Sequence, residues 1–435
     1  MKMILVALSF LITLPAYALS PIQNIESNDC LNAWLIEDHR NPIVAIRFDF
    51  HGGAALDPIG KEGLARLASA TMDEGAGPWT SHDFQSQLQD NSISLSFDAD
   101  MDGYGGQVLT LKKNLPKAID LLSAALTQPR FDQEAVERIR TQLVSSLKQR
   151  EEDPNSIAML NLYKSILGDH PYARGTQGTV DGMQNITIAD LKKFANDRLA
   201  KDNLVVGIVG DVTPAETKDL LENIFGGLPQ KSTLWKLDEA VLKLGHPLQI
   251  TQKNVPQSSL VFMQEGIDRH DKDFYAAYIL NYILGSGGFS SRLYEEVREK
   301  RGLVYSIYSS FINYDAANLW VVGAGTQNAL ASETLKVVKD EWQKIHDHGV
   351  TAEEVENAKT YLTGSYNLRF NSSDTIANIL SNIQLQNLPI SFLEERNKLV
   401  EAVSLEDVNR LAKQLVDPEA LSIAIVGQPE GLPPQ

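Results

Sequence analysis

Two apolar stretches decide the fold of this sequence: Leu204-Val-Val-Gly-Ile-Val-Gly210 and Leu421-Ser-Ile-Ala-Ile-Val-Gly427. Each follows a segment with a helix-capping signal, in which a Thr or Ser precedes an acidic side chain by three positions. These signals stand at Thr187-Ile-Ala-Asp-Leu191 and Ser404-Leu-Glu-Asp-Val408. The caps recur at an offset of 217 positions, and so do the two Ile-Val-Gly endings. We therefore predict an internal duplication of units of roughly 200 residues.

Both halves combine the hydrophobic periods of strands and of helices. Apolar and polar side chains alternate over residues 46–51 and 92–97, as in strands with one buried face. Helical spacing of apolar residues marks residues 115–126, 135–147 and 330–345. Strand pairs separated by helix pairs predict an α+β fold. We expect two tandem homologous α/β units, each a mostly antiparallel sheet with helices packed on one face.

The predicted organisation has four parts. An export signal occupies residues 1–18, and an N-terminal unit occupies residues 19–228. A linker that is polar and rich in turn residues at its ends spans residues 229–247. The C-terminal unit then covers residues 248–435.

The export signal is inferred from the first residues of the chain. Lys2 precedes an apolar run too short for a comfortable membrane span, and Ala16-Tyr17-Ala18 has the small-x-small form of a signal-peptidase site. An uncleaved N-terminal anchor is the alternative. With cleavage near Ala18 we expect a protein with no membrane span, located in the periplasm of a Gram-negative bacterium.

The composition of the chain excludes several classes of protein. Its 435 residues include 39 Lys and Arg against 56 Asp and Glu, which gives a formal net charge of −17. Nucleic-acid binding needs clustered cations to neutralise phosphates, so we expect no nucleic-acid partner. The single cysteine, Cys30, excludes intramolecular disulfides, multi-cysteine zinc sites and iron–sulfur clusters.

Several common catalytic signatures are missing from the sequence. None of the eight histidines lies in H-E-x-x-H or H-x-x-E-H, and no G-x-S-x-G marks a nucleophile elbow. His346-Asp-His348 is interpreted as an exposed helix end rather than a metal site. Gly285-Ser-Gly-Gly288 lacks the Gly-Lys-Ser/Thr of a phosphate loop, so it is interpreted as a flexible turn before a helix.

The stretch after this turn carries a sharper signal. Residues 289–311 have the pattern of a helix, a break at Gly302 and an alternating strand. Here the chain after the export signal resembles the pitrilysin/insulysin (insulinase) family of metallopeptidases, inverted zincins built from duplicated α+β units. The C-terminal half of that family carries the pattern Leu-Arg-x-x-x-Gly-Leu-x-Tyr. Arg298 and Tyr305 match its arginine and tyrosine, while Val297 replaces its leading leucine.

The resemblance implies that this pair acts in peptide hydrolysis. A tetrahedral intermediate carries negative charge, which a guanidinium and a phenol hydroxyl stabilise by donating hydrogen bonds. Arg298 and Tyr305 are therefore the candidate catalytic residues. The alternative is a surface salt bridge at Arg298 and a half-buried strand residue at Tyr305. The candidate substrate-binding residues lie just upstream of the pair: Gly285, Gly287, Gly288 and Phe289.

The same resemblance reveals a departure at the metal site. The family places Gly-Leu-Ala-His-x-x-Glu-His on a helix of its N-terminal half, where residues 63–70 of this sequence read Gly-Leu-Ala-Arg-Leu-Ala-Ser-Ala. Arg66, Ser69 and Ala70 stand where His, Glu and His belong, and residues 144–147 lack the glutamate expected as the third ligand. Zinc would have no ligands and water no general base, so we expect no metal on this chain.

The match and the departure together predict one subunit of a pair. Some members of the family divide the work between two similar chains, one supplying H-x-x-E-H and the other the Arg/Tyr pair. We expect the non-zinc subunit of a periplasmic heterodimeric peptidase, akin to the alpha subunit of mitochondrial processing peptidase. It would be inactive alone, with zinc in a homologous H-x-x-E-H partner and peptides as substrates. The alternatives are a catalytically inactive structural or peptide-binding protein, and a lone enzyme with unconventional ligands.

Overall fold

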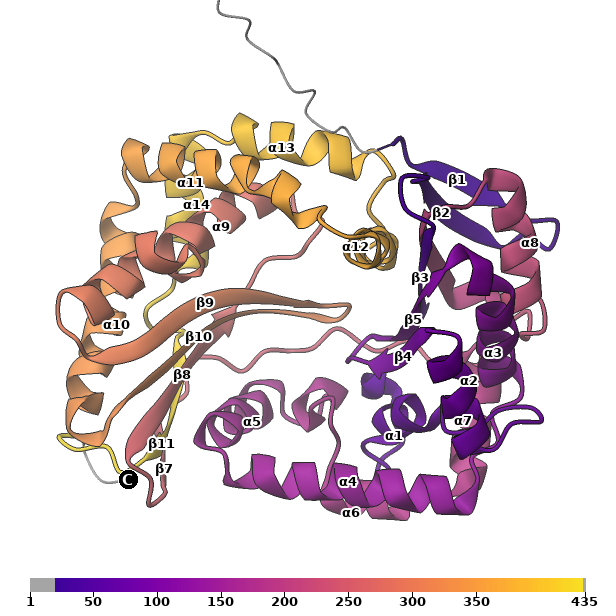
Figure 1. Ribbon diagram of the computed structural model, residues 1–435. Coiled ribbons are helices and arrows are strands. Elements are labelled where there is room, and N and C mark those ends of the chain that lie inside the picture. The colour runs from indigo at the N-terminus through magenta and orange to yellow at the C-terminus, as the bar shows by residue number, and fades with distance from the viewer. Residues whose placement is uncertain (1–19, 433–435) are drawn as a thin grey trace, which may run out of the picture.

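The computed structural model describes residues 20–432, which form two sheet-and-helix units side by side (Figure 1). The N-terminal unit contains a six-stranded sheet and the C-terminal unit a five-stranded one. The predicted α+β fold with two tandem units is confirmed. The expected export signal lies outside the described residues. Between residues 20 and 432, no helix is long and apolar enough to cross a membrane.

The N-terminal sheet has the strand order β1-β2-β6-β3-β5-β4. β2 and β6 are parallel, and every other neighbouring pair is antiparallel. The strands are β1 (Gln23–Glu26), β2 (Asn32–Glu37), β3 (Ile43–His51), β4 (Ser94–Ala99), β5 (Gly103–Leu111) and β6 (Leu204–Gly210). The helices are η1 (Ala54–Leu56), α1 (Leu64–Thr71), α2 (Ser81–Asp90), η2 (Lys112–Asn114), α3 (Leu115–Thr127), α4 (Gln133–Glu152), α5 (Pro154–Leu167), η3 (Pro171–Arg174), α6 (Val180–Asn185), α7 (Ile188–Arg198), η4 (Lys201–Asn203) and α8 (Pro214–Phe225).

The C-terminal sheet has the strand order β7-β11-β8-β10-β9. β7 and β11 are parallel, and the other neighbouring pairs are antiparallel. The strands are β7 (Gln249–Gln252), β8 (Gln257–Glu265), β9 (Val304–Tyr314), β10 (Ala317–Gln327) and β11 (Ser422–Gly427). The helices are α9 (Phe274–Asn281), η5 (Tyr282–Ser286), η6 (Gly288–Ser290), η7 (Tyr294–Glu299), η8 (Asn328–Leu330), α10 (Ala331–His348), α11 (Ala352–Gly364), η9 (Tyr366–Arg369), α12 (Ser373–Leu385), α13 (Phe392–Ala402) and α14 (Leu405–Leu415).

The two sheets share one topology, as expected for duplicated units. Apart from the extra edge strand β1, the order β2-β6-β3-β5-β4 corresponds strand by strand to β7-β11-β8-β10-β9. The strands that end in Ile-Val-Gly occupy equivalent places, because each lies between a parallel and an antiparallel neighbour. Ile208 of β6 lies opposite Leu35 of β2 and Ile46 of β3, and Ile425 of β11 lies opposite β7 and β8 in the same way.

The predicted helix caps are also repeated. The Thr187 side chain accepts a hydrogen bond from Asp190 N at the start of α7, and the Asp190 carboxylate accepts one from Thr187 N. Ser404 and Asp407 form the same reciprocal capping box at the start of α14. The box satisfies two backbone N–H groups that a helix start leaves without partners.

One helix of each unit packs on the sheet of the other unit. α5 of the N-terminal unit packs on β8 and β11, and α12 of the C-terminal unit packs on β3 and β6 (Figure 1). Each sheet therefore has helices of its own unit on one face and a single helix of its neighbour on the other. The apolar contact between α12 and the N-terminal sheet consists of Ile36, Ala45, Val209, Ile376, Ala377 and Leu380.

Strand β3 shows how the helix from the other unit covers a face that the sequence pattern predicts to be exposed. The alternation over residues 46–51 predicts one solvent-facing side, yet Asp49 on that side is buried because α12 covers it. Ser381 of α12 donates a hydrogen bond to Asp49 Oδ2 at 2.5 Å. Arg47 forms ion pairs with both Asp49 and Asp98. Asp49 is therefore a partner in the contact between the units, and Arg47 binds its carboxylate from within the N-terminal unit.

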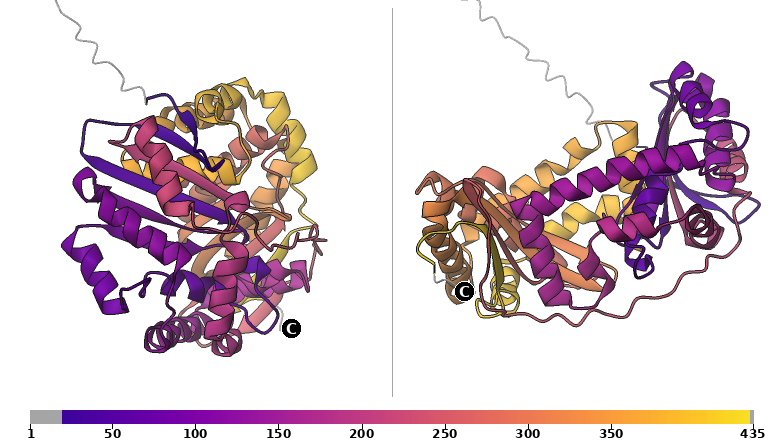
Figure 2. Two further views of the ribbon diagram at one scale, coloured as in Figure 1. Left: turned by 90° about the vertical axis from the view of Figure 1, so that its right-hand side faces the viewer. Right: turned by 90° about the horizontal axis from the view of Figure 1, so that it is seen from below.

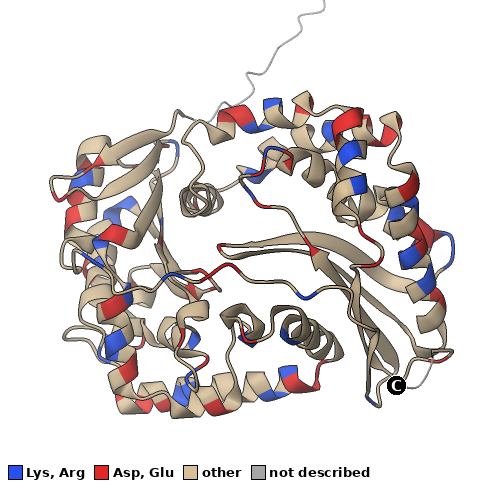
Figure 3. Cartoon of the chain, turned by 180° about the vertical axis from the view of Figure 1, so that it is seen from behind, with Lys and Arg blue, Asp and Glu red and all other residues tan. Residues whose placement is uncertain are grey.

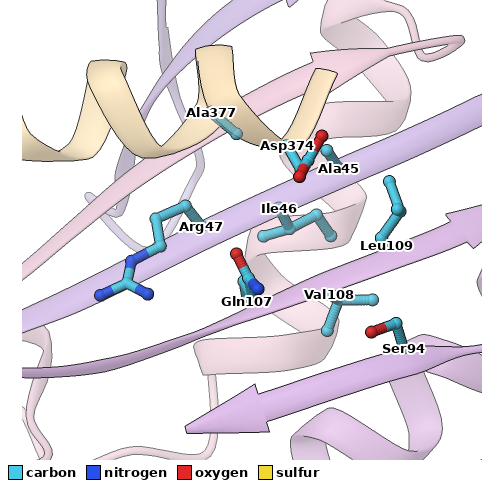
Figure 4. Close-up of a pocket in the computed structure, with 9 residues that line it drawn as sticks. All are labelled: Ala45, Ile46, Arg47, Ser94, Gln107, Val108, Leu109, Asp374 and Ala377. Carbon is cyan, nitrogen blue, oxygen red and sulfur yellow. The ribbon is translucent and has the colours of Figure 1, made fainter. Parts of the chain in front are cut away.

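The contact between α12 and the N-terminal sheet leaves one small gap. A cavity of about 100 Å³ is lined by Asp374 and Ala377 of α12, by Ala45 and Arg47 of β3 and by Gln107 of β5 (Figure 4). Further along α12, Gln384 Nε2 donates to the carbonyl oxygen of Val206 at 2.9 Å. The helix is thus held by its apolar side and by polar contacts at several points.

The segment between α8 and β7 contains no helix or strand over residues 229–248. It runs as an extended chain along one side of both units (Figure 2). Lys243 N donates to the carbonyl oxygen of Ile166 at 2.8 Å, and Gly245 N donates to that of Ala420 at 3.1 Å. The predicted linker segment therefore contacts both units.

Candidate functional site

The arginine of the Arg/Tyr pair lies on a π-helix. η7, which contains Arg298, has the wide turn in which Lys300 N donates to Glu295 O at 2.9 Å, five residues back. Such turns are rare in proteins, but those that occur are often found at functional sites. Gly302, with φ of 62°, lies in the turn after this helix, and its N–H donates to the Arg298 carbonyl oxygen at 2.8 Å. This tight turn brings the start of β9 close to Arg298.

A β-bulge turns the tyrosine of the pair towards solvent. The pairing of β9 with β10 shifts by one residue near the start of β9, so that Tyr305 and Ser306 lie opposite the single residue Gly325. Bulges of this kind re-aim side chains and are common next to active sites. Strict alternation would have placed Tyr305 on the same face as Ile307, which is 4% exposed, whereas Tyr305 is 83% exposed.

The structure brings Arg298 and Tyr305 together with two further aromatic rings. Arg298 Cζ lies 5.4 Å from the ring centroid of Tyr305, 4.6 Å from that of Tyr294 and 5.9 Å from that of Phe289. The Phe289 and Tyr294 rings meet edge to face with their centroids 4.8 Å apart. We call these four residues the arginine–aromatic cluster. Phe289 is 81% exposed, so the cluster is open to solvent.

No carboxylate neutralises Arg298 within residues 20–432. Two acidic side chains of the same helix are bound to other cations: Glu295 pairs with Lys300 at 2.9 Å, and Glu296 pairs with Lys300 and Arg301 at 2.6 Å. The alternative of a salt bridge at Arg298 and a half-buried Tyr305 is therefore not what the described residues show. The hydroxyl of the buried Tyr294 also lacks a hydrogen-bond partner in this part of the chain.

The cluster is suited to binding an electron-rich oxygen atom. A guanidinium offers five N–H donors, and a phenol offers one O–H donor. Aromatic faces attract the cation and hold it in place without neutralising it. Arg298 and Tyr305 can therefore donate together to one carbonyl or oxyanion that approaches from solvent.

The four candidate substrate-binding residues fall into two groups. Gly285 is buried against β9, where a Cβ atom would lie 2.6 Å from Ser309 Oγ, and a Cβ at Gly287 would lie 2.7 Å from a carbonyl oxygen of η5. These two glycines shape the turn by close backbone approach. Gly288, with φ of 56° and open space around it, and Phe289 face solvent. Only the second pair is placed to touch a substrate directly.

The positions of the missing zinc motif lie on α1 and are filled by other interactions. Arg66 Nε donates to Gln177 Oε1 at 3.2 Å, and Arg66 Nη1 donates to Ser69 Oγ at 3.3 Å. Ser69 is buried, and Ala70 offers no ligand atom. Arginine is a permanent cation, so it repels a metal ion instead of coordinating one. The residues at these positions do not fit zinc.

The residues at the expected position of the third zinc ligand do not fit zinc either. Residues 144–147 lie on α4, where Ser145 Oγ donates to its own helix at the Thr141 carbonyl oxygen, 2.9 Å away. Across residues 20–432, no group of three or more His, Cys, Asp or Glu side chains could hold a metal ion. The described chain therefore contains no zinc peptidase centre of the inverted-zincin type.

A large cavity borders the same region. It has a volume of about 1020 Å³ and lies between α5, the end of α4 and the loop of residues 174–179. Gln177, which accepts the hydrogen bond from Arg66, is part of its wall. Leu147, Leu160 and Tyr163 supply apolar surface, and charged side chains such as Lys164 supply polar surface. A cavity of this size and mixture is typical of a site for a peptide segment or a small molecule.

The far end of β9 is attached to the N-terminal unit. At the β9–β10 turn, Asp315 N donates to Asp102 Oδ2 at 3.1 Å, and Ala316 N donates to the Tyr172 hydroxyl oxygen at 3.1 Å. The Tyr172 hydroxyl donates in turn to Asp102 Oδ1 at 2.6 Å. One half-buried carboxyl, that of Asp102, thus joins the hairpin to the other unit.

This attachment predicts a pH-dependent stability. The pKa of Asp102 is raised to about 7, mainly by burial and in addition by the nearby Asp315 carboxylate. The hydrogen bond from Tyr172 acts in the opposite direction and lowers the pKa. The unfolded chain releases this proton near pH 4. Asp102 therefore contributes stability that is complete below pH 4 and is lost as pH rises through 7. We expect the unfolding free energy of Asp102→Asn, relative to the unmodified protein, to rise by about 1–3 kcal/mol between pH 5 and pH 8.

Urea unfolding at several pH values measures this difference. Asp273→Asn is the matched control, because the Arg410 hydrogen bond holds the pKa of Asp273 below its usual range. Its difference from the unmodified protein stays constant between pH 5 and pH 8. A flat curve for Asp102→Asn would show that Asp102 is ionised throughout.

Comparison with known families agrees with this geometry. Residues 33–180 match the model described as Insulinase (Peptidase family M16), and residues 185–362 match the model described as Peptidase M16 inactive domain. The chain belongs to peptidase family M16. The resemblance inferred from the Arg/Tyr pair and the duplication is confirmed, and the M16 matches extend into both units.

Relatives of this M16 chain match it over most of its length. The non-peptidase homolog YmxG of Helicobacter pylori is 28% identical over 397 residues, which cover 90% of each protein. The uncharacterized zinc protease YmxG of Bacillus subtilis is 26% identical over 317 residues, 73% of this chain and 76% of the relative. A crystal structure of the peptidase M16 inactive domain from Pseudomonas fluorescens, 27% identical, has a TM-score of 0.89 over 95% of this chain and 99% of that one.

Sequence reasoning missed one member of the arginine–aromatic cluster. Tyr294 was not a candidate, although it precedes Arg298 by four positions and so shares its helix face. Its ring is the one nearest to the guanidinium. An aromatic residue four positions before a candidate catalytic arginine is the signal that could have identified it.

Proposed function

We propose that this M16-family chain is the non-zinc subunit of a periplasmic two-chain peptidase, in which Arg298 and Tyr305 bind the substrate. The observation that carries the proposal is the arginine–aromatic cluster. It presents an arginine without an acidic partner and an exposed tyrosine, while Arg66 fills the metal position of the same chain. A chain with the substrate-binding half of the family's machinery and without the metal half is suited to act with another chain.

The proposed division of labour follows from the chemistry of the two halves. Zinc and a general base belong to a homologous H-x-x-E-H subunit. Arg298 donates N–H groups to the substrate carbonyl oxygen, and its hold strengthens as negative charge develops there. The Tyr305 hydroxyl donates to the same oxygen or to a neighbouring one. The residues 1–18 pattern supports export, so the complete site would form in the periplasm.

Co-purification with the partner tests the proposal. The chain is co-expressed with a homologous H-x-x-E-H protein from the same genome, and the complex is isolated through a tag on the partner. We expect a 1:1 complex that cleaves an unstructured fluorogenic peptide, whereas this chain alone binds no zinc and cleaves nothing. A chelator should abolish the cleavage, because the metal is held by the partner. Absence of a complex, or equal activity of the partner alone, would contradict the proposal.

The cavity beside α5 favours a second candidate function. Its volume of about 1020 Å³ and its mixed lining suit a peptide segment even without catalysis. In that case the chain is a catalytically inactive structural or peptide-binding protein. Peptide binding by the isolated chain, with no gain of cleavage in any complex, distinguishes this function from the first.

A further inference from the structure

Arg298 lies in the densely charged stretch Glu-Glu-Val-Arg-Glu-Lys-Arg. Lys and Arg lie among Asp and Glu along the helices of the C-terminal unit (Figure 3), and the cations after Arg298 use this: Lys300 and Arg301 both pair with Glu296 at 2.6 Å. Within residues 20–432 Arg298 forms no ion pair, although Glu295 precedes it by three positions. On an α-helix that spacing places a glutamate beside an arginine. The unpaired guanidinium therefore needs an explanation in the local structure.

The first part of the explanation is the wide helix turn that carries Arg298. In η7 the amide of Lys300 donates to Glu295 O, five residues back, so a turn holds more residues than the about 3.6 of an α-helix. Side chains that lie above one another are then four and five positions apart instead of three and four. Glu295, three positions before Arg298, is turned to the side and pairs with Lys300 at 2.9 Å. Tyr294, four positions before Arg298, lies beneath it, with the ring centroid 4.6 Å from Arg298 Cζ.

The second part is that the Tyr294 ring is itself held in place. Tyr294 is 6% exposed, and the Phe289 ring meets it edge to face with the centroids 4.8 Å apart. A cation is attracted to an aromatic face, and at the surface this attraction is at least as strong as an exposed ion pair along a helix. A neutral ring also leaves the positive charge intact, which a carboxylate does not. Arg298 can therefore stay over Tyr294 while the nearby glutamates bind other cations.

The hydroxyl of Tyr294 takes no part in this contact. It is buried and finds no hydrogen-bond partner in residues 20–432. A buried hydroxyl without a partner costs free energy instead of contributing it. The part of Tyr294 that the cluster uses is therefore the ring face, which phenylalanine would supply equally well.

We infer that Tyr294 is a positioning residue: its ring, on the π-helix turn, holds the Arg298 guanidinium away from Glu295 and available to a substrate carbonyl oxygen. This inference rests on the proposed function and adds to it the group that keeps the arginine unpaired before the substrate binds. Without the ring, Arg298 competes with Lys300 for Glu295, and a paired guanidinium has fewer N–H groups to offer. The carboxylate also cancels part of the attraction for a developing oxyanion.

Arginine reactivity in the isolated chain tests whether the ring keeps Arg298 unpaired. Phenylglyoxal modifies guanidinium groups, and an acidic partner slows this reaction because it stabilises the protonated group. Peptide mass spectrometry follows Arg298, with Arg301, which is bound to Glu296, as the internal reference. Tyr294→Leu is compared with the double variant that also carries Glu295→Gln, since both lack the ring. We expect Glu295→Gln to speed the reaction of Arg298 about threefold in the Leu background and to leave it unchanged when Tyr294 is present.

Steady-state kinetics of the two-chain complex tests the consequence for the substrate. We expect Tyr294→Leu to lower kcat about tenfold with little change in KM, because a misplaced donor is missed mainly in the transition state. Tyr294→Phe keeps the ring and should restore the lost activity. Glu295→Gln should recover most of the loss in the Leu background, although it adds no packing. A tyrosine that only supported the fold would not be rescued by a change at Glu295.

Tyr294→Met provides a second variant in case the leucine variant does not fold. Methionine is flexible enough to fill the space of the ring but has no aromatic face, so the same losses and the same rescue are expected. The inference is overturned if Tyr294→Phe loses as much activity as the variants without a ring. It is also overturned if Glu295→Gln neither speeds the modification of Arg298 nor restores kcat in those variants.

Two outcomes separate this inference from the proposed function. If Arg298→Ala abolishes cleavage while Tyr294→Leu leaves kcat unchanged, the proposed function holds and the positioning role of Tyr294 does not. If no active complex forms, the proposed function fails, and the phenylglyoxal reaction of the isolated chain still decides whether Tyr294 keeps Arg298 unpaired.

Discussion

We expect Arg298→Ala to lower kcat/KM of the proposed two-chain peptidase about 100- to 1,000-fold, the usual cost of removing one oxyanion donor. The guanidinium has no acidic partner within residues 20–432, so its loss removes a substrate contact and leaves no buried charge behind. Because the charge on the carbonyl oxygen develops in the transition state, most of the loss should fall on kcat. Steady-state kinetics on a fluorogenic peptide measures this.

Two variants define what the result means. Arg301→Ala removes an arginine three positions away that is bound to Glu296, and it should leave kcat/KM within about threefold, as for surface substitutions elsewhere. Arg298→Lys keeps the charge but loses the planar fork of donors, so it should recover only part of the activity. If Arg298→Ala retains near-full kcat while the complex still forms, the arginine is not a donor to the reaction.

The second large effect concerns the exchanged helix α12. We expect Gly207→Val to destabilise the protein by about 3 kcal/mol, the upper part of the range for overpacking a well-filled contact. A Cβ at Gly207 would lie 2.5 Å from the carbonyl oxygen of Ala377 and 2.9 Å from Leu380 Cβ. Both belong to the α12 surface that covers β6, so the helix must move as a whole. The higher strand propensity of valine offsets only a small part of this cost.

Urea unfolding and small-angle X-ray scattering check this prediction together. Displacement of α12 should lower the unfolding midpoint and enlarge the radius of gyration, because α12 is a contact between the units. Gly325→Val is the matched control: it also places valine in a strand, but no atom lies within 4 Å of its Cβ. Equal midpoints for the two variants would mean that α12 does not pack tightly on β6.

The fold could be predicted because the information for it is local. The capping boxes at Thr187 and Ser404 and the apolar strands that follow them repeat at one spacing, and a repeated spacing implies a repeated unit. The exchange of α5 and α12 could not be predicted in the same way. The apolar stripe of Ile376, Ala377 and Leu380 shows which side of the helix is buried, but not which sheet buries it.

Part of the candidate site could be predicted from the sequence, and part could not. Arg298 and Tyr305 are paired through the resemblance to the family pattern and not from spacing alone; the short turn at Gly302 is what keeps the two residues close in the structure. The exposure of Tyr305 depends on the register between β9 and β10, which no local pattern in β9 encodes. Gly325 in the partner strand was the available sign, since a glycine inside a strand often marks a bulge.

The exchanged helices also indicate how the chain arose. A single ancestral unit would have exposed one apolar sheet face, because the helix that covers this face in the present protein comes from the other unit. Two copies of such a unit could cover both faces by trading one helix each, as in a domain-swapped homodimer. Joining the copies through residues 229–248 makes that association intramolecular, and it frees each copy to diverge. In the present chain the C-terminal copy carries the Arg/Tyr cluster, and the N-terminal copy has Arg66, Ser69 and Ala70 at the positions of the family's metal motif.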